Sequence, residues 1–124
     1  MLRVRTQRLG DVATLRFHGR IVKGVESAML RKAVFAQEGA SVVVLDLARV
    51  NGVDAGGLGS LLELREWTQS KGIEFRLVNV TKLVKQVLEI TRLDTVFEIS
   101  SEEDAQSNVT RRRARAVEED VACA

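Results

Sequence analysis

The sequence predicts a single α/β domain built on a mixed β-sheet. Two segments of period-two alternation stand at the N-terminus, and after them apolar runs alternate with segments of helical periodicity. The length of 124 residues corresponds to one domain. Because strands separated by helices pair in parallel through crossover connections, a hairpin followed by such an alternation gives a mixed sheet with parallel strands.

The N-terminal segments predict a β-hairpin. Residues 2–8, LRVRTQR, alternate apolar and basic side chains, as expected for a half-exposed strand at a sheet edge. Gly10-Asp11 turns the chain, and residues 12–18, VATLRFH, place Ala13, Leu15 and Phe17 on one face. Residues 19–24 are expected to form a connector.

A helix and a central strand follow this connector. Residues 25–38 predict a helix that ends at Gly39. Its expected buried stripe lies near Val25, Met29, Ala33 and Ala36 and is widened by Ala28, Leu30 and Val34. Residues 42–47, VVVLDL, form a continuous apolar run rich in β-branched residues. Such a run is typical of a central strand that is covered on both faces.

The C-terminal half continues the alternation. A second helix is expected over about residues 57–70, with Leu58, Leu61, Leu62 and Leu64 on its buried side and Gly72 at its end. A strand follows at 75–80, and Thr81 then caps a third helix, in which apolar residues recur at helical spacing: Leu83, Val84, Val87 and Leu88. A short strand is expected at 95–99. A final helix opens at the capping box of residues 100–103 and runs to about 117. About four helices are therefore expected.

Composition excludes several classes of function. The balance of 45% apolar and 29% charged residues is that of a soluble protein, no apolar run approaches a membrane span, and the N-terminus lacks a signal peptide, so a cytoplasmic location is expected. The net charge of +2 does not indicate nucleic-acid binding. The basic cluster Arg111–Arg113 with Arg115 is followed by acidic residues and is interpreted as a solvated helix face or a tail. Cys123, the only cysteine, is interpreted as a thiol near the chain end.

No catalytic or metal-binding constellation can be assembled from the sequence. The only histidine, His18, lies on an exposed face of a predicted strand, and no metal-ligand spacing, nucleophile elbow or phosphate-binding glycine motif occurs. Asp46 is interpreted as a paired carboxylate or one at a strand end, and Trp67 as a partly buried core residue, with a partner-binding anchor as the alternative. No cofactor and no metal ion are expected.

The stretch VDAGGLG, residues 53–59, stands where a strand gives way to a helix. The simplest role for Asp54 is that of a helix N-cap, and the glycines would allow positive φ or the close approach of another backbone. Caps and tight turns explain the stretch adequately. A docking turn for a partner protein is the alternative.

The segments VVVLDLARVNGVDAGGLGSLLEL and GIEFRLVNVTKLVKQVLEITRLDTVFEI resemble the two halves of STAS domains, the family of sulfate transporter and anti-sigma factor antagonist domains. In that family a run such as VVLDL leads through a short second strand into Asp-Ser-Ser-Gly-Leu-Gly and a helix. The resemblance covers about residues 3–105, and it implies a STAS-like domain over 1–105 with helices mainly on one face of the sheet. Residues 106–124 are expected to form a C-terminal helical extension or tail.

The resemblance also implies a function. Anti-sigma factor antagonists bind a serine-kinase-like anti-sigma factor, which phosphorylates the first Ser after the Asp, and a phosphatase reverses this. Here that position is Ala55, which has no hydroxyl, and the next is Gly56, whereas Asp54, Gly57, Leu58 and Gly59 match the pattern. A second departure is Arg92, where the family commonly has Gly after the third helix, so modest strain or a different cap is expected there.

The sequence therefore suggests a non-enzymatic regulator that binds a protein partner without a phosphorylation switch at the usual site. The expected partner-binding residues are Asp54, Ala55, Gly56, Gly57, Leu58, Gly59 and Ser60, together with the loop around residues 19–24. Ser60 is interpreted as a packing serine rather than a substitute phosphoacceptor. The alternatives are an accessory STAS subunit of a phospholipid-type ABC transport complex, which would dock on the ATPase, and a small-molecule sensor; a homodimer remains open.

Overall fold

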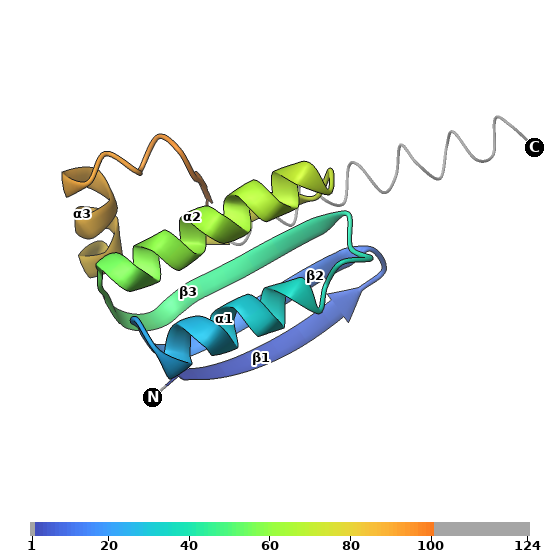
Figure 1. The fold of residues 1–124 in the computed structure, drawn as a ribbon, viewed down its shortest axis with the longest axis horizontal. Coiled ribbons are helices and arrows are strands. Elements are labelled where there is room, and N and C mark those ends of the chain that lie inside the picture. Colours follow the sequence, from blue (N-terminus) through green and yellow to red (C-terminus); the bar gives the residue numbers. More distant parts are fainter. Residues whose placement is uncertain (1, 101–124) are drawn as a thin grey trace, which may run out of the picture.

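The structure, a computed structural model, describes residues 2–100 of the chain, and of Ser100 only the backbone. Figure 1 shows its helices and strands, which are β1 (Leu2–Leu9), β2 (Val12–Ile21), α1 (Val25–Phe35), β3 (Val42–Val53), α2 (Ala55–Ser70), β4 (Glu74–Val78), α3 (Lys82–Ile90) and β5 (Glu98–Ser100). Three helices are thus described where about four were expected. The predicted final helix, the Arg111–Arg115 cluster and Cys123 lie outside the described residues.

The sheet is mixed, as the sequence predicts. Within residues 2–100 it has five strands in the order β1-β2-β3-β4-β5, with β1 antiparallel to β2 and every other neighbouring pair parallel. β1 and β2 form the expected hairpin, in which Leu9 pairs with Val12 and Gly10 adopts a φ of 62°. The first strand lies at a sheet edge, and α1 and α2 lie side by side across one face, where they run in the direction opposite to the parallel strands (Figure 1).

The main core lies between that face and the helices. Its strand residues include Ala13, Leu15 and Phe17 of β2, which are at most 2% exposed, as period-two alternation predicts. The helix residues that complete it are Leu30 and Val34 of α1, Leu58, Leu61 and Leu64 of α2, and Val84 and Leu88 of α3. On the second face of the sheet, a smaller buried cluster consists of Val12, Val42, Val44 and Val78.

Two strands are longer than the sequence predicts. β2 continues to Ile21, so the expected connector of residues 19–24 shrinks to the residues between Ile21 and α1. β3 runs unbroken from Val42 to Val53 instead of ending at 47 and leading through a separate short strand. The two extensions pair with each other, since Ile21 lies opposite Val53. This pairing stabilises them as strands although their sequences show little period-two alternation.

Helix boundaries and faces also differ in places. α1 ends at Phe35, and residues 36–39 form turns in which Gln37 donates to the Val34 carbonyl. Its buried residues are Ser27, Leu30 and Val34, so the stripe was correct at Leu30 and Val34. It was wrong at Val25, which is 72% exposed, and at Ala28 and Ala36, which are also exposed. In α2, Leu62 is only partly buried, and in α3, Leu83 is 49% exposed.

Two residues with positive φ end the later elements. Asn79 (φ 54°) turns the chain directly after Val78, so β4 stops two residues before the predicted end at 80. Arg92 (φ 60°) follows α3 at the position where a glycine was considered more usual. A non-glycine residue in this region is strained, which agrees with the expectation for Arg92.

Candidate functional site

The candidate site is built around the N-terminus of α2, where Asp54 caps the helix. One carboxylate oxygen of Asp54 accepts a hydrogen bond from the Gly57 N–H at 2.7 Å. The same carboxylate accepts the Lys23 N–H, at 3.1 and 3.2 Å to its two oxygens. These backbone donors, Gly57 first and Lys23 second, lower the pKa of Asp54 from its ordinary value of 3.8.

Asp54 therefore does more than cap one helix. Lys23 belongs to the segment between β2 and α1, so the carboxylate joins that segment to the start of α2. The Asp54 N–H also donates to the Ile21 carbonyl at 3.4 Å. The turn and the segment before α1 are consequently one connected surface. The sequence predicts one docking site for the turn and this segment, but no sequence pattern predicts the hydrogen bond from Lys23 to Asp54 that joins them.

The glycines of the turn serve close approach and not positive φ. Gly56 and Gly57 lie inside α2, and neither has a positive φ. A Cβ on Gly57 would stand 2.0 Å from the Ile21 carbonyl oxygen, and a Cβ on Gly56 would stand 2.5 Å from the Lys23 Cβ. These two positions let α2 lie directly against the end of β2. A Cβ on Gly59, in contrast, would meet nothing within 4 Å.

Burial divides the seven expected site residues into two groups. Gly57, Leu58 and Ser60 are buried and face the rest of the domain. Asp54, Ala55 and Gly59 are exposed, and Gly56 is partly exposed. Only the second group can touch a partner directly. Substitutions at Gly57, including Gly57→Trp, would disturb packing against Ile21 and do not test docking alone.

Ser60 is held in a packed position between two helices. Its hydroxyl donates to the Gly56 carbonyl at 3.1 Å and accepts from Arg31 Nη1 at 3.2 Å. The same Arg31 nitrogen lies 4.0 Å from the Glu63 carboxylate. Ser60 is 4% exposed, so a kinase cannot reach its hydroxyl without local opening. This geometry agrees with the interpretation of Ser60 as a packing serine.

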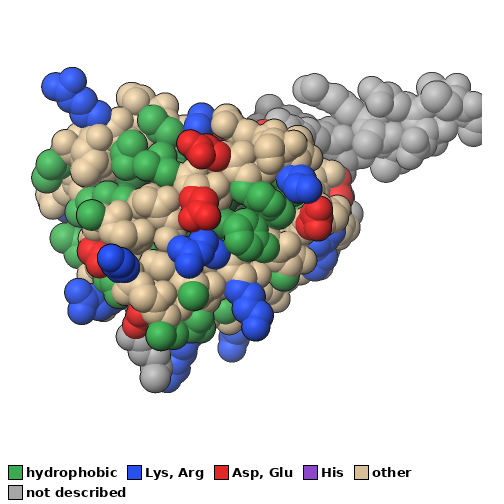
Figure 2. Space-filling model, in the orientation of Figure 1, with side chains coloured by type: hydrophobic (Ala, Val, Ile, Leu, Met, Phe, Trp, Pro, Cys, Tyr) green, Lys and Arg blue, Asp and Glu red, His purple; other side chains and the backbone are tan. Residues whose placement is uncertain are grey.

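Exposed side chains of α1 border the turn. Val25 and Ala28 are exposed near the start of α1, next to the segment that Asp54 binds. Figure 2 views the side formed by α1 and α2, where charges of both signs are interspersed with apolar groups. One apolar contact there is between Phe35 and Trp67, whose ring centroids lie 4.9 Å apart in an edge-to-face arrangement. Trp67 is thus a partly buried packing residue.

The other candidate residues lie apart from this turn. His18 is exposed on β2, as predicted. Asp46 is 6% exposed and paired: its carboxylate lies 3.4 Å from Arg16 Nε and accepts the Ala48 N–H at 3.0 Å. Within residues 2–100, no group of three or more His, Cys, Asp or Glu side chains is placed to hold a metal ion. No helix in the same range is long and apolar enough to cross a membrane.

Residues 3–106 match the model of the STAS domain family. The fold resembles an anti-sigma factor antagonist from Mycobacterium paratuberculosis, with 22% identity, a TM-score of 0.74, and coverage of 89% of this chain and 95% of that one. It also resembles the unphosphorylated anti-sigma factor antagonist SpoIIAA, with 15% identity, a TM-score of 0.73, and coverage of 87% and 96%.

A larger protein contains a similar fold. The murine anion transporter Slc26a9 matches with 22% identity and a TM-score of 0.59 over 67% of this chain, which corresponds to 14% of the transporter chain. At these identities the likeness to each solved structure is one of fold.

Proposed function

This chain belongs to the STAS domain family, and on that premise we propose that it is a non-enzymatic, protein-binding regulator similar to anti-sigma factor antagonists. The proposed partner is a serine-kinase-like anti-sigma factor, and with it we propose a role in transcription regulation in the bacterial cytoplasm. The proposed docking surface consists of Asp54, Ala55, Gly56 and Gly59 with Lys23 and Gly24, and we call it the α2 docking surface.

One observation carries the proposal: the first residue of α2 is an exposed alanine, held beside a capping aspartate. A phosphorylated residue at this place would add about −1.5 to −2 charges next to Asp54 and so change the surface that a partner contacts. Ala55 cannot receive a phosphate, and Ser60 is enclosed by Gly56 and Arg31. We therefore propose that binding is constitutive at this site.

The test compares Ala55→Glu with the wild type in affinity capture from the native cytosol, read by mass spectrometry. A glutamate at the first helical position suits the helix dipole, so the fold should remain intact. Its charge should nevertheless imitate part of the phosphate effect and abolish capture. Ala36→Glu is a matched control, because Ala36 is exposed at the opposite end of α1 and lies outside the α2 docking surface.

Recovery of a kinase-like anti-sigma factor by the wild type and Ala36→Glu, with loss in Ala55→Glu, is the expected result. The Ala55→Ser variant should then bind the same anti-sigma factor. When ATP is added, the captured kinase should phosphorylate the introduced serine, and the phosphorylated variant should release the kinase. Equal recovery of one set of proteins by all variants would contradict the proposal.

A second function is kept because similar folds occur in transport proteins, as the likeness to Slc26a9 indicates. In that case the chain is an accessory subunit that docks on the ATPase of a phospholipid-type ABC complex. An alanine that cannot be phosphorylated suits a permanent subunit as well. Recovery of transporter ATPase subunits, in place of an anti-sigma factor, would favour this function.

A further inference from the structure

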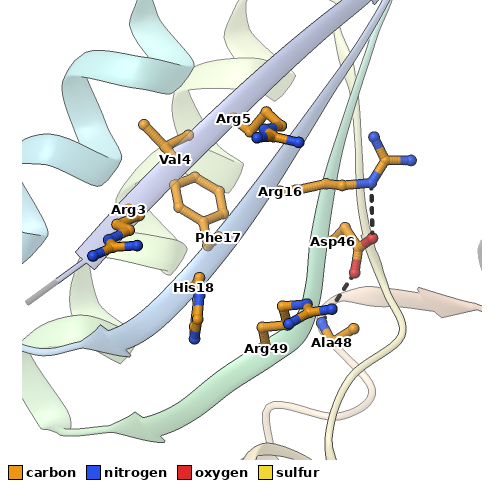
Figure 3. A pocket seen from close by; sticks show the side chains of 9 residues that line it. All are labelled: Arg3, Val4, Arg5, Arg16, Phe17, His18, Asp46, Ala48 and Arg49. Carbon is orange, nitrogen blue, oxygen red and sulfur yellow. Dashed lines mark hydrogen bonds and ion pairs between the residues drawn. The ribbon is translucent and has the colours of Figure 1, made fainter.

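The sheet face opposite α1 and α2 carries a pocket of about 640 Å³. Its ionisable lining residues come from three neighbouring strands: Arg3 and Arg5 of β1, Arg16 and His18 of β2, and Asp46 and Arg49 of β3 (Figure 3). None of these residues belongs to the α2 docking surface, which lies at the start of a helix. The pocket is therefore a separate feature of the molecule.

Strand register brings these side chains together. Arg3 lies opposite His18, and His18 lies opposite Arg49, so one row of the pocket crosses all three strands. Arg5, Arg16 and Asp46 form the next row in the same way. Neighbouring strands are about 4.8 Å apart, so each row presents its charged groups within the span of a small ligand.

An irregularity in β3 shapes the pocket. Between the two rows β2 advances by two residues, from Arg16 to His18, while β3 advances by three, from Asp46 to Arg49. The extra residue is a β-bulge, a feature that often re-aims side chains beside functional sites. As a result Ala48 and Arg49 are both exposed, and the small Ala48 leaves room between Asp46 and Arg49. The Ala48 N–H bond to Asp46 holds the bulge.

The pocket has an excess of positive charge. It contains four arginines and one aspartate, whereas the whole chain has a net charge of only +2. Asp46 is already engaged by Arg16, by the Ala48 N–H and by the Asn79 amide at 3.4 Å. Arg3, Arg5 and Arg49 are exposed, and within residues 2–100 their side chains make no hydrogen bond or ion pair. Within residues 2–100, three guanidinium groups of the pocket thus have no acceptor and are available to an external anion.

We propose that this pocket binds a small multivalent anion that carries phosphate groups. Guanidinium forks match phosphate oxygens in two-bond geometry, and several of them around one depression suit a ligand with more than one phosphate. Apart from His18, the only ring in the described lining is Phe17, which is 2% exposed and offers no face for stacking. Four arginines against one imidazole ring favour the phosphate chain over a base as the recognised part of the ligand.

The same chemistry can come from a free polyphosphate ester or from a lipid headgroup. The experiment therefore measures binding of inorganic phosphate, pyrophosphate, tripolyphosphate and ATP to the full chain by titration calorimetry and amide chemical shifts. A parallel arm measures co-sedimentation with phosphatidylglycerol vesicles. Arg3→Gln combined with Arg49→Gln removes one cation from each side of the pocket. Lys32→Gln combined with Lys85→Gln removes the same charge from exposed helix positions.

Affinity should rise from phosphate to tripolyphosphate, and ATP should bind within about threefold of tripolyphosphate because the described lining exposes no Phe, Tyr or Trp ring on which a base could stack. The Arg3/Arg49 variant should lose about tenfold or more in affinity, since bonds to charged groups are the strong ones, while the Lys32/Lys85 variant keeps the wild-type value. Shifts should be confined to residues 3–5, 16–18 and 46–49. Arginine-dependent binding to vesicles alone would support the proposal with a lipid headgroup as the source.

Other results would overturn the proposal. These are no binding of any probe at millimolar concentration, equal losses in both double variants, or shifts that map to another surface. Binding of a hexaglutamate peptide without binding of the phosphates would assign the pocket to an acidic polypeptide instead. None of these outcomes depends on whether the α2 docking surface captures a partner, so the two proposals fail separately.

Discussion

At the scale of single residues, the neighbouring glycines Gly57 and Gly59 of α2 differ in whether the structure requires glycine. Gly57 lies against the Ile21 carbonyl, where no Cβ fits, whereas Gly59 faces open space on an exposed helix surface. The sequence could place the capping Asp54 and the helix start, because both depend on local chemistry. It could not separate Gly57 from Gly59, because the difference comes from a contact with β2.

This difference gives opposite effects for the same substitution. Gly59→Ala should stabilise the protein by about 0.5–1 kcal/mol, because alanine loses less conformational entropy in a helix. Gly57→Ala should destabilise it by about 1–3 kcal/mol or more, because the added Cβ overlaps the Ile21 carbonyl and must displace α2. Urea unfolding of both variants checks this. Equal changes in unfolding free energy would show that the close approach at Gly57 is not stabilising.

At the scale of elements, the strands and helices were predictable where their patterns were strong, and their ends were not. The run at 42–47 predicted a strand, but Ala48 to Gly52 lack period-two alternation because the bulge puts two successive side chains on the exposed face. Pairing with β2 extends the strand to Val53 regardless. Likewise, Asn79 and Arg92 end elements by backbone conformations that local composition does not specify.

The junction of β3, α2 and the segment before α1 should respond to acid. The bonds to Asp54 favour its charged form and lower its pKa, so the stability that they supply is present above the ordinary value of 3.8 and is lost as the pH falls through the lowered value. Asp54→Asn remains a helix cap but cannot titrate. The wild type should therefore be more stable than Asp54→Asn near neutral pH, and the difference should shrink towards about pH 3.

Urea midpoints measured across this range test the junction. Asp11→Asn is the control, because Asp11 is an exposed carboxyl at the β1–β2 turn, away from α2. A gap between wild type and Asp54→Asn that stays constant with pH, or one that Asp11→Asn reproduces, would contradict the assignment.

At the scale of the whole molecule, the sheet separates two surfaces of different character. The helix side carries the α2 docking surface, and the opposite side carries the arginine pocket (Figures 1 and 3). The order of elements and the mixed sheet were predictable because hairpins and crossover connections leave few topologies. The pocket was not, because Arg3, Arg5 and His18 look in sequence like an ordinary solvated strand face. Only the register across β1, β2 and β3 gathers them.

If both proposals hold, the two surfaces should act independently. The charge added by Ala55→Glu lies on the other side of the sheet, and screening limits its reach to about 8 Å at physiological ionic strength. Tripolyphosphate affinity in this variant should therefore stay within about twofold of the wild-type value, and capture of the partner by the Arg3/Arg49 variant should be unchanged. Mutations at separate sites without shared partners usually add in this way.

A measured coupling would have a specific meaning. Asp46 and Arg49 belong to the same strand that ends at Val53, directly before the capping Asp54. The neighbouring β2 likewise carries Arg16 and His18 and ends at Ile21, so both strands lead from the pocket to the docking surface. If saturating tripolyphosphate altered partner affinity, thermodynamic reciprocity would require the partner to alter tripolyphosphate affinity by the same factor. Measuring both factors therefore decides between two independent surfaces and a pocket that regulates docking through the strands shared by both, and unequal factors would show that the effect is not binding linkage at all.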